Sequence, residues 1–158
     1  LHLSIRRQRQ MCIRDRIVYI ERAYSERSGM QVVRAIGGRA PLHLTSVGKL
    51  FLAADDPLRV RSYATRTGLS GQTRNSITQL PVLERELSRV KQYGIARDNE
   101  ELELGVRCIA AGIYDDQGKL LAGLSISAPA DRLDENWLPK LQAAARDISA
   151  TLGYTADH

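Results

Sequence analysis

The chain has 158 residues, 43% of them hydrophobic and 26% charged, which suits one globular domain with a buried core and excludes a disordered chain. No run of about 18 apolar residues is present, so we expect no membrane span, and the charged first residues lack the apolar stretch of a secretory signal. Two cysteines far apart do not make a disulfide framework, which favours a reducing, cytoplasmic location.

The net charge of +5 is concentrated at the start of the chain. Leu1–Arg16 contains five arginines and one aspartate, whereas the remaining residues are close to neutral. A nearly neutral domain has little electrostatic attraction for a nucleic-acid backbone. The opening segment shows no helix or strand period, and Met11–Arg16 resembles a translated sequencing adapter. We therefore interpret residues 1–16 as a non-native or linker-like basic segment and exclude them from the fold prediction.

The first elements expected in the fold are two strands. Ile17–Tyr24 and Met30–Ile36 are rich in apolar and β-branched residues and are separated by a charged, glycine-containing stretch. This pattern predicts a hairpin. Gly37–Pro41 is expected to break the structure after it.

Three helices are expected next in the chain. Leu44–Ala54 has an apolar face and begins with Thr45 or Ser46 as its N-cap. Leu58–Thr67 follows a proline that suits a first helical turn, and it precedes a glycine that suits a helix end. Leu80–Tyr93 repeats leucine and valine at helical spacing.

The second half of the chain is predicted to form three strands and a helix. Ile95–Asp98 is short, and Val106–Tyr114 forms a hairpin with Lys119–Ser127 across the four-residue turn Asp115–Gly118. A linker, Ala128–Leu133, leads to a last helix. That helix begins near Asp134 or Asn136, and its apolar stripe consists of Leu138, Leu141, Ala145, Ile148 and Leu152. Hairpins with segregated helices, and no βαβ alternation, indicate an α+β domain with an antiparallel sheet.

Polar side chains on the last hairpin form the main candidate site. Alternation along the strands places Ser125 and Ser127 on one face of their strand, and Cys108 lies on the strand that pairs with it. With a four-residue turn, Cys108 would lie opposite Ser125, within reach of one small ligand. The alternatives are a buried structural cysteine and a hydroxyl face that is exposed to solvent.

Two further segments could add polar groups to this site. In the acidic run Asp98–Glu103, Asp98 stands at a strand end and is expected to face inward, whereas the others are typical of a solvated loop. No cluster of His or Cys with metal-ligand spacing accompanies them, so we expect no metal site. The helix opening at Thr45–Val47 offers free amides to a carboxylate, unless it is a plain N-cap. A catalytic pair of Cys108 with His43 is the weaker alternative.

Three segments carry a resemblance to a known family. They are G-G-R-A-P-L-H-L-T-S-V-G-K-L-F-L-A, Y-G-I-A-R-D-N-E-E-L-E-L-G-V-R-C-I-A and D-D-Q-G-K-L-L-A-G-L-S-I-S-A-P-A-D-R-L. In this order they resemble the C-terminal effector-binding domain of IclR-family bacterial transcription regulators. The resemblance covers about residues 17–154 and leaves 155–158 as a tail. It implies a GAF-like α+β domain, a curved antiparallel sheet flanked by helices, that senses a ligand, is not an enzyme and needs no cofactor.

The resemblance also implies a pocket for a small carboxylate effector, such as a 2-oxo acid, a sugar acid or an aromatic acid. In it the backbone amides of Ser46 and Val47 would bind the carboxylate. The effector-binding residues that it implies are Ser46, Val47, Asp98, Cys108, Ser125 and Ser127, and the pocket-lining residues are Leu42, Leu44 and Val106.

The partners follow from the same resemblance. DNA would be bound only through an N-terminal winged helix-turn-helix domain that this chain lacks, and the domain would form a homodimer or homotetramer without contact to a membrane. Two other functions stay open as alternatives. One is an enzyme with Cys108 as its nucleophile, and the other is an oligomerisation domain whose pocket is vestigial.

Overall fold

An antiparallel sheet is the central layer of the fold. The computed structural model describes residues 2–5, 15–23 and 37–156. Within these ranges six strands form one sheet in the order β3-β2-β1-β6-β5-β4, and each neighbouring pair is antiparallel. The strands are β1 (His2–Ile5), β2 (Arg16–Arg22), β3 (Arg39–Pro41), β4 (Ile95–Asn99), β5 (Val106–Tyr114) and β6 (Leu120–Pro129).

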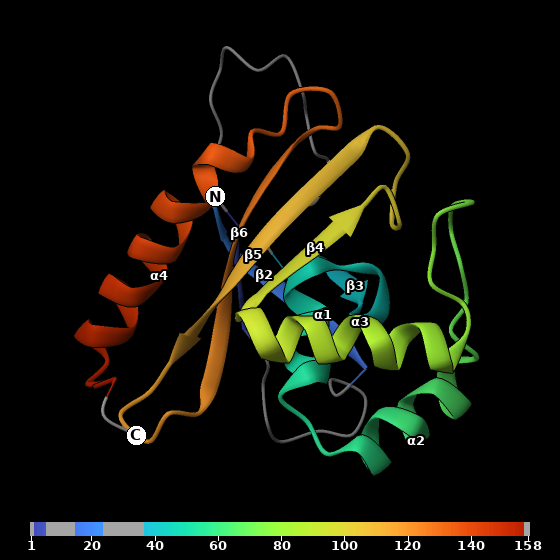
Figure 1. The fold of residues 1–158 in the computed structure, drawn as a ribbon, viewed down its shortest axis with the longest axis horizontal. Helices are drawn as coiled ribbons and strands as arrows, with labels where there is room; N and C mark the ends of the chain where they lie inside the picture. The colour runs from blue at the N-terminus through green and yellow to red at the C-terminus, as the bar shows by residue number, and fades with distance from the viewer. Residues whose placement is uncertain (1, 6–14, 24–36, 157–158) are drawn as a thin grey trace.

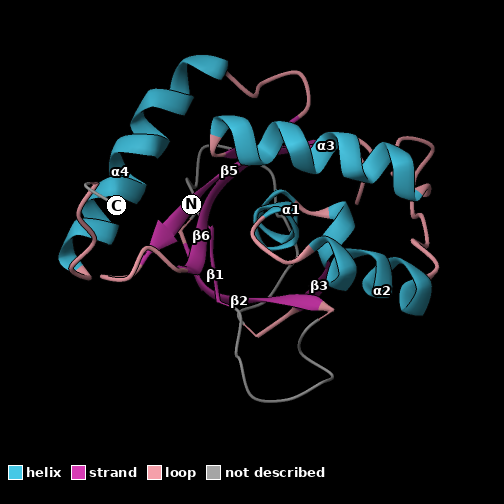
Figure 2. Ribbon diagram, turned by 60° about the horizontal axis from the view of Figure 1, so that its bottom comes forward, coloured by secondary structure: helices cyan, strands magenta, loops and turns pink. Residues whose placement is uncertain are grey.

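Helices cover both faces of this sheet. The helices are α1 (Ser46–Ala53), α2 (Pro57–Thr67), α3 (Leu80–Tyr93) and α4 (Leu138–Thr151), with short 3-10 turns at Leu42–Leu44 and Glu135–Trp137. One face of the sheet packs against α4 through β5 and β6, and the other packs against α1, which in turn contacts α3 (Figure 1). The strands curve around α1 (Figure 2). The predicted α+β class, with a curved antiparallel sheet flanked by helices, is thus confirmed.

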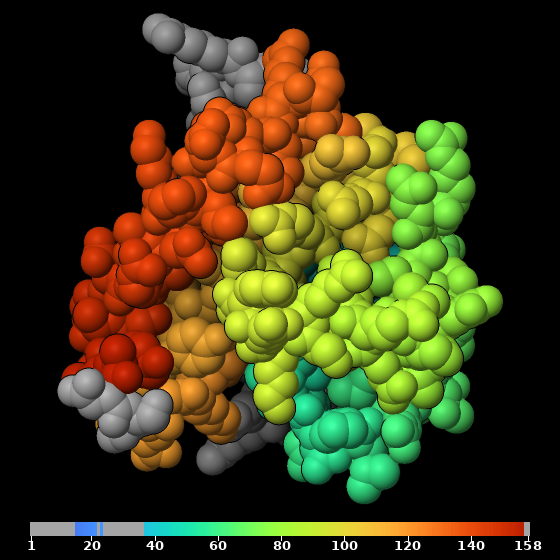
Figure 3. Space-filling view, viewed as in Figure 1, coloured from blue at the N-terminus to red at the C-terminus, as the bar shows by residue number. Residues whose placement is uncertain are grey.

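Two apolar cores lie on the two faces of β5. Ile109, Ala111 and Ile113 belong to the core beneath α4, whereas Ala110 between them belongs to the core beneath α1. This alternation is what the period of two in a strand requires. In the space-filling view α4 lies at the left and α3 at the right, with atoms of the strands between them (Figure 3).

A glycine on β6 sets how closely α1 approaches the sheet. A Cβ atom at Gly123 would lie only 2.6 Å from a γ carbon of Val47, so a larger residue would force the helix outward. The opening turn of α1 therefore rests directly on the centre of the sheet.

The three helices between β3 and β4 agree with their predicted bounds to within two residues. Thr45 is the N-cap of α1, and its hydroxyl accepts a hydrogen bond of 3.2 Å from the Gly48 N–H. The helices α2 and α3 end at Gly68 and Gly94, which adopt the left-handed φ values of 63° and 70°. None of the helices in the described ranges combines the length and apolar character that crossing a bilayer requires.

Two short strands differ from the sequence prediction. His2–Ile5 lies in the sheet between β2 and β6, so part of the segment excluded above takes part in the fold. The interpretation of residues 1–16 as non-native or linker-like stays a prediction. Arg39–Pro41 pairs with β2, whereas the sequence predicts only a break there. The strand lies at the edge of the sheet, where a proline is tolerated. The predicted strand Met30–Ile36, and with it the first hairpin, lies outside the described residues.

The buried face of α4 also differs from the predicted stripe, at its C-terminal end. Ile148 and Leu152 are 36% and 45% exposed, whereas Ser149 is only 2% exposed. The Ser149 hydroxyl donates to the Ala145 carbonyl at 2.8 Å and accepts from the Tyr114 N–H at 3.0 Å. The buried Ser149 hydroxyl thus satisfies the Tyr114 N–H at the end of β5. Helical periodicity alone predicts an apolar residue on this face and not a serine.

Candidate functional site

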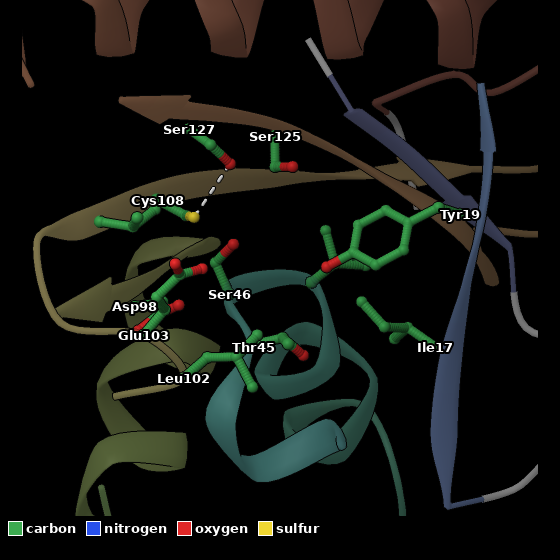
Figure 4. A pocket seen from close by; sticks show the side chains of 12 residues that line it. Ile17, Tyr19, Thr45, Ser46, Asp98, Leu102, Glu103, Cys108, Ser125 and Ser127 are labelled. Carbon is green, nitrogen blue, oxygen red and sulfur yellow. Dashed lines mark hydrogen bonds between the residues drawn. The ribbon is translucent and has the colours of Figure 1, made fainter. Parts of the chain in front are cut away.

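A small cavity lies between the opening of α1 and the sheet (Figure 4). Its volume is about 30 Å³, which is room for roughly two water molecules. This volume is smaller than an acid of several heavy atoms, so binding of one implies an outward shift of lining side chains or of the turn after β4 (residues 100–105). The lining residues are Ile17, Tyr19, Thr45, Ser46, Val47, Asp98, Leu102, Glu103, Val106, Cys108, Ser125 and Ser127. All six residues that the sequence analysis assigned to effector binding are among them.

The pairing of β5 with β6 differs by two residues from the predicted register. Cys108 lies opposite Ser127, and Ser125 lies opposite Ala110. One residue of the shift comes from a turn longer than predicted, since Tyr114 pairs with Leu120, and the other comes from an irregularity beside Ile113. A shift of two leaves every side chain on its predicted face. The prediction that Cys108 faces Ser125 is therefore wrong, while the shared face of the thiol and the hydroxyls is correct. The strand also continues through the first residues of the predicted linker.

Three polar residues form a row across the sheet. Asp98 on β4 lies opposite Cys108 on β5, which lies opposite Ser127 on β6. The Cys108 Sγ and Ser127 Oγ atoms are 3.0 Å apart and share a hydrogen bond (Figure 4). Ser125 is only 4% exposed, so the hydroxyl face is not a solvent-facing side of the sheet. The three strands together present a carboxyl group, a thiol and two hydroxyls to one cavity.

Burial changes the acidity of Asp98. This side chain is 2% exposed, and its Oδ1 atom accepts a 2.8 Å hydrogen bond from the Glu101 N–H. Burial raises the pKa of Asp98 to about 6 from its ordinary value of 3.8, although the Glu101 N–H opposes the shift. The carboxyl group can therefore exchange a proton near neutral pH, and a bound anion beside it would favour the protonated form.

The opening of α1 forms the opposite wall of the cavity. Ser46 and Val47 are 3% and 2% exposed, and the Ser46 side chain is drawn next to the Asp98 carboxyl group in the close view (Figure 4). The Gly48 and Lys49 amides already donate to Thr45. The Ser46 and Val47 amides precede them, at helical positions that have no intrahelical acceptor. These two N–H groups suit an acceptor such as a carboxylate oxygen.

The charged members of the lining are both acidic. Asp98 and Glu103 line the cavity, and the lining contains no Lys, Arg or His among the residues that the structure describes. An anion placed here would gain no direct salt bridge from the lining. Its binding would rest on backbone amides, hydroxyls and the helix dipole, and would be opposed by the two carboxylates when they are ionised.

The residues Leu42 and Leu44 differ from their predicted role. Both are buried, but neither lines this cavity. Their 3-10 turn directs them into the core instead. His43 in the same turn does not approach Cys108 as a base, because its ring hydrogen-bonds to the Tyr63 hydroxyl at 2.7 Å and to the Ser70 carbonyl at 2.9 Å. Burial lowers the pKa of His43.

A buried ion pair between α1 and the turn after β4 is missing from the sequence prediction. Lys49 and Glu101 are 1% and 4% exposed, and their Nζ and Oε2 atoms are 2.8 Å apart. The signal in the sequence is a single lysine in the buried helix Ser46–Ala53, which has no other charged residue, because a buried charge needs a partner. Glu101 itself stands in the acidic run that the sequence analysis interpreted as solvated beyond Asp98.

The described part of the chain holds no group of three or more His, Cys, Asp or Glu side chains arranged for a metal ion.

A family model described as "Bacterial transcriptional regulator IclR C-terminal" matches residues 1–151. The chain belongs to the IclR family. The resemblance of the three sequence segments is thereby confirmed, and the match also includes the basic segment at the start of the chain.

Curated members of the IclR family match most of this chain. The HTH-type transcriptional regulator KdgR is 39% identical in Escherichia coli K12 and 38% identical in Dickeya chrysanthemi, over 89% of this chain and 54% and 47% of those proteins. The DNA-binding transcriptional repressor YiaJ of E. coli K12 is 38% identical over 81% of the chain. The chain spans about half the length of these relatives. They are named as transcriptional regulators, in agreement with the expectation that this IclR domain is not an enzyme.

Solved IclR-family structures share the fold. The transcriptional regulator YaiJ superposes with a TM-score of 0.88 at 32% identity, covering 98% of this chain and 85% of that one. The C-terminal domain of E. coli KdgR gives 0.79 at 37% identity, covering 97% and 87%. A double mutant of the PobR inducer binding domain from Acinetobacter, in complex with 3-hydroxybenzoic acid, gives 0.81 at 25% identity, covering 94% and 86%.

Proposed function

We propose that this IclR-family domain binds a small carboxylate effector in the cavity at the opening of α1. The effector would be a 2-oxo acid, a sugar acid or an aromatic acid. Through this binding the domain would control DNA binding by an N-terminal winged helix-turn-helix domain of the parent protein. We also propose that the domain acts as a homodimer or homotetramer.

One observation carries the proposal. Ser46 and Val47, whose amides have no intrahelical acceptor, line the same cavity as the row of Asp98, Cys108 and Ser127, although these residues come from four separate elements. A carboxylate could accept from the two amides and from the serine hydroxyls. Asp98 could then accept a hydrogen bond from a hydroxyl of the effector, or donate one while it is protonated.

A related structure supports the ligand class. The PobR neighbour is described as an inducer binding domain and was solved with an aromatic hydroxy acid. An acid of this kind has a carboxylate for the amides and a hydroxyl for an acceptor such as Asp98. The absence of cations from the described lining also favours ligands with a single negative charge over dianions.

The control of DNA binding would follow from a difference in affinity. An effector that binds one arrangement of the parent protein better than another shifts the population by that difference, typically about 1–3 kcal/mol. Entry into the cavity requires outward movement of its walls, because its present volume is about 30 Å³. Movement of the turn after β4, or of α1, is therefore the conformational change through which effector binding could alter a neighbouring domain or subunit.

Removal of the serine hydroxyls is the test of this site. Calorimetric titration would compare pyruvate, glyoxylate, gluconate and 3-hydroxybenzoate on the chain and on the Ser125→Ala/Ser127→Ala variant. We expect at least one acid to bind, and its affinity to fall roughly 100-fold or more in the variant, since two hydrogen bonds to a charged group are lost. Ser88→Ala is the matched control, because the Ser88 hydroxyl is exposed on α3 and donates to the Glu84 carbonyl. Equal affinities in the double variant and the control would contradict the site.

The small volume of the cavity favours a second candidate function. A cavity with room for two waters suits an oligomerisation domain whose pocket no longer binds a ligand. Self-association without binding of any acid in the titrations would support this candidate against the proposed one.

A further inference from the structure

The cavity has two walls that belong to separate parts of the chain. The α1 wall carries the Ser46 and Val47 amides, and the turn after β4 carries Leu102 and Glu103 and follows Asp98. A carboxylate that bridges these walls is held well only if the distance between them is fixed to a fraction of an ångström. Local backbone preference does not favour the conformation of this turn. Glu100 adopts a positive φ of 58°, which is unfavourable for a residue with a side chain. Something beyond local preference must hold it.

Lys49 connects α1 to that turn. It lies one helical turn beyond Ser46, and it is 1% exposed. Its ammonium group donates to the Arg97 carbonyl at 2.7 Å and to the Glu101 Oε2 atom at 2.8 Å. The Glu86 carboxylate of α3 lies farther off, at 3.6 Å. Both short contacts of Lys49 therefore go to the end of β4 and to the turn that follows.

Glu101 passes this connection on to Asp98. Its Oε2 atom accepts from Lys49 and also from the Asn99 N–H at 3.0 Å, which closes the turn. Its own N–H donates to the Asp98 Oδ1 atom at 2.8 Å. Its carbonyl accepts from the Ser76 hydroxyl at 2.6 Å. A single residue thus receives the lysine and orients the carboxyl group that faces the cavity.

Stability alone gives a poor account of this pair. Buried ion pairs can often be replaced by apolar residues of similar size without loss of stability, since desolvation offsets their attraction. The Glu101 Oε1 atom is buried without a hydrogen-bond partner in the described structure, which makes this pair costlier still. The geometry that the pair fixes is the better reason for its presence.

We propose that Lys49 and Glu101 are positioning residues for effector binding: their buried ion pair holds the amides of α1 at a set distance from the turn that carries Asp98. This proposal rests on the proposed function of the cavity. Neither side chain needs to contact the effector. Loss of the pair should therefore weaken recognition of a carboxylate even where the fold is as stable as before.

Alkylation of Cys108 provides a test that does not require a known effector. The Cys108 thiolate displaces iodide from iodoacetate or from iodoacetamide, forming a thioether, and only iodoacetate carries a carboxylate. The ratio of the two rates measures carboxylate recognition in the cavity, because the reactivity of the thiol affects both rates. All proteins carry Cys12→Ser, which leaves Cys108 as the single cysteine. The neutral thiol 2-mercaptoethanol gives the intrinsic ratio.

The variant to compare is Lys49→Met/Glu101→Met. It removes one charge of each sign, so the net charge and the long-range field are unchanged. The matched control is Arg61→Met/Glu84→Met, which removes an exposed pair of α2 and α3 with Nε and Oε1 atoms 3.2 Å apart. Urea unfolding of each protein records its stability in parallel. If the first variant does not fold, Glu101→Asp keeps both charges, shortens the reach by one methylene and is measured in its place.

We expect the rate ratio of the parent chain to exceed that of 2-mercaptoethanol, and to fall about tenfold in Lys49→Met/Glu101→Met, the size of one lost charge-assisted hydrogen bond. The Arg61→Met/Glu84→Met control should keep the parent ratio. A raised ratio that persists in the first variant would overturn the positioning role and leave the cavity as a carboxylate site. A parent ratio no higher than that of 2-mercaptoethanol would overturn the proposed function, and the positioning role with it.

Discussion

Replacing Lys49 by methionine alone is expected to lower the free energy of unfolding by about 3–5 kcal/mol, the usual cost of breaking a buried ion pair by removing one partner. The ammonium group is 1% exposed and supplies the Glu101 carboxylate with its 2.8 Å partner. Without it the carboxylate stays buried with the Asn99 N–H as its remaining hydrogen bond. The methionine side chain fills a similar volume, so the loss reports the uncompensated charge and not a cavity.

Urea unfolding followed by circular dichroism measures this loss. Lys140→Met is the control, because Lys140 is exposed on α4, and we expect it to change the unfolding free energy by less than about 0.5 kcal/mol. The double variant Lys49→Met/Glu101→Met should recover most of the stability lost in the single variant. Equal losses in Lys49→Met and Lys140→Met would show that the buried pair does not contribute as described.

Replacing Asp98 by asparagine is expected to stabilise the domain above pH 6. The folded pKa of Asp98, about 6, lies above its ordinary value of 3.8 because the side chain is buried. Between these values the folded state binds the proton and the unfolded state releases it. The contribution of Asp98 to stability is therefore fully present below pH 3.8 and is lost as the pH rises through 6. The distance between the two pKa values corresponds to about 3 kcal/mol.

Asparagine keeps an oxygen that can accept from the Glu101 N–H, so Asp98→Asn isolates the charge. The measurement is the difference in unfolding free energy between Asp98→Asn and the parent chain from pH 3.5 to 8. Titration of other groups cancels in this difference. The variant should gain up to about 3 kcal/mol over the parent as the pH rises from 3.8 to above 6, with no further change at higher pH. A difference that does not change with pH would contradict the raised pKa.

Local sequence signals predicted the helices well. A proline, a glycine or a capping hydroxyl marks most of the helix ends, and such residues act through their own backbone or the next turn. Thr45, Gly68 and Gly94 are the clearest examples. The short strand Arg39–Pro41 was not predictable in the same way, because it exists only through its pairing with β2.

The candidate site was predicted only in part from the sequence. The period of two in a strand fixes the face of a side chain, so Cys108, Ser125 and Ser127 could be assigned to one face correctly. The partner across the strands depends on turn length and on irregularities, and these moved Cys108 from Ser125 to Ser127. The cavity volume depends on tertiary packing, which periodicity does not contain.

Local sequence patterns could not predict the ion pair between Lys49 and Glu101. The two residues are 52 positions apart, and each has an ordinary interpretation by itself. A lysine in an apolar helix calls for a buried partner, but five acidic residues of α3 and the turn after β4, Glu84, Glu86, Glu100, Glu101 and Glu103, could supply it. Only the packing of α1 against β4 selects Glu101.

The most direct test of the account is protection of Cys108 by a bound acid. The Cys12→Ser chain is treated with iodoacetamide at pH 7 with and without pyruvate, glyoxylate, gluconate or 3-hydroxybenzoate, and alkylation is followed by mass spectrometry. We expect that at least one acid slows alkylation in a saturable manner, and that Ser125→Ala/Ser127→Ala abolishes this protection at the same concentration. Alkylation at one unchanged rate in every acid would contradict the claim that this cavity binds a small carboxylate.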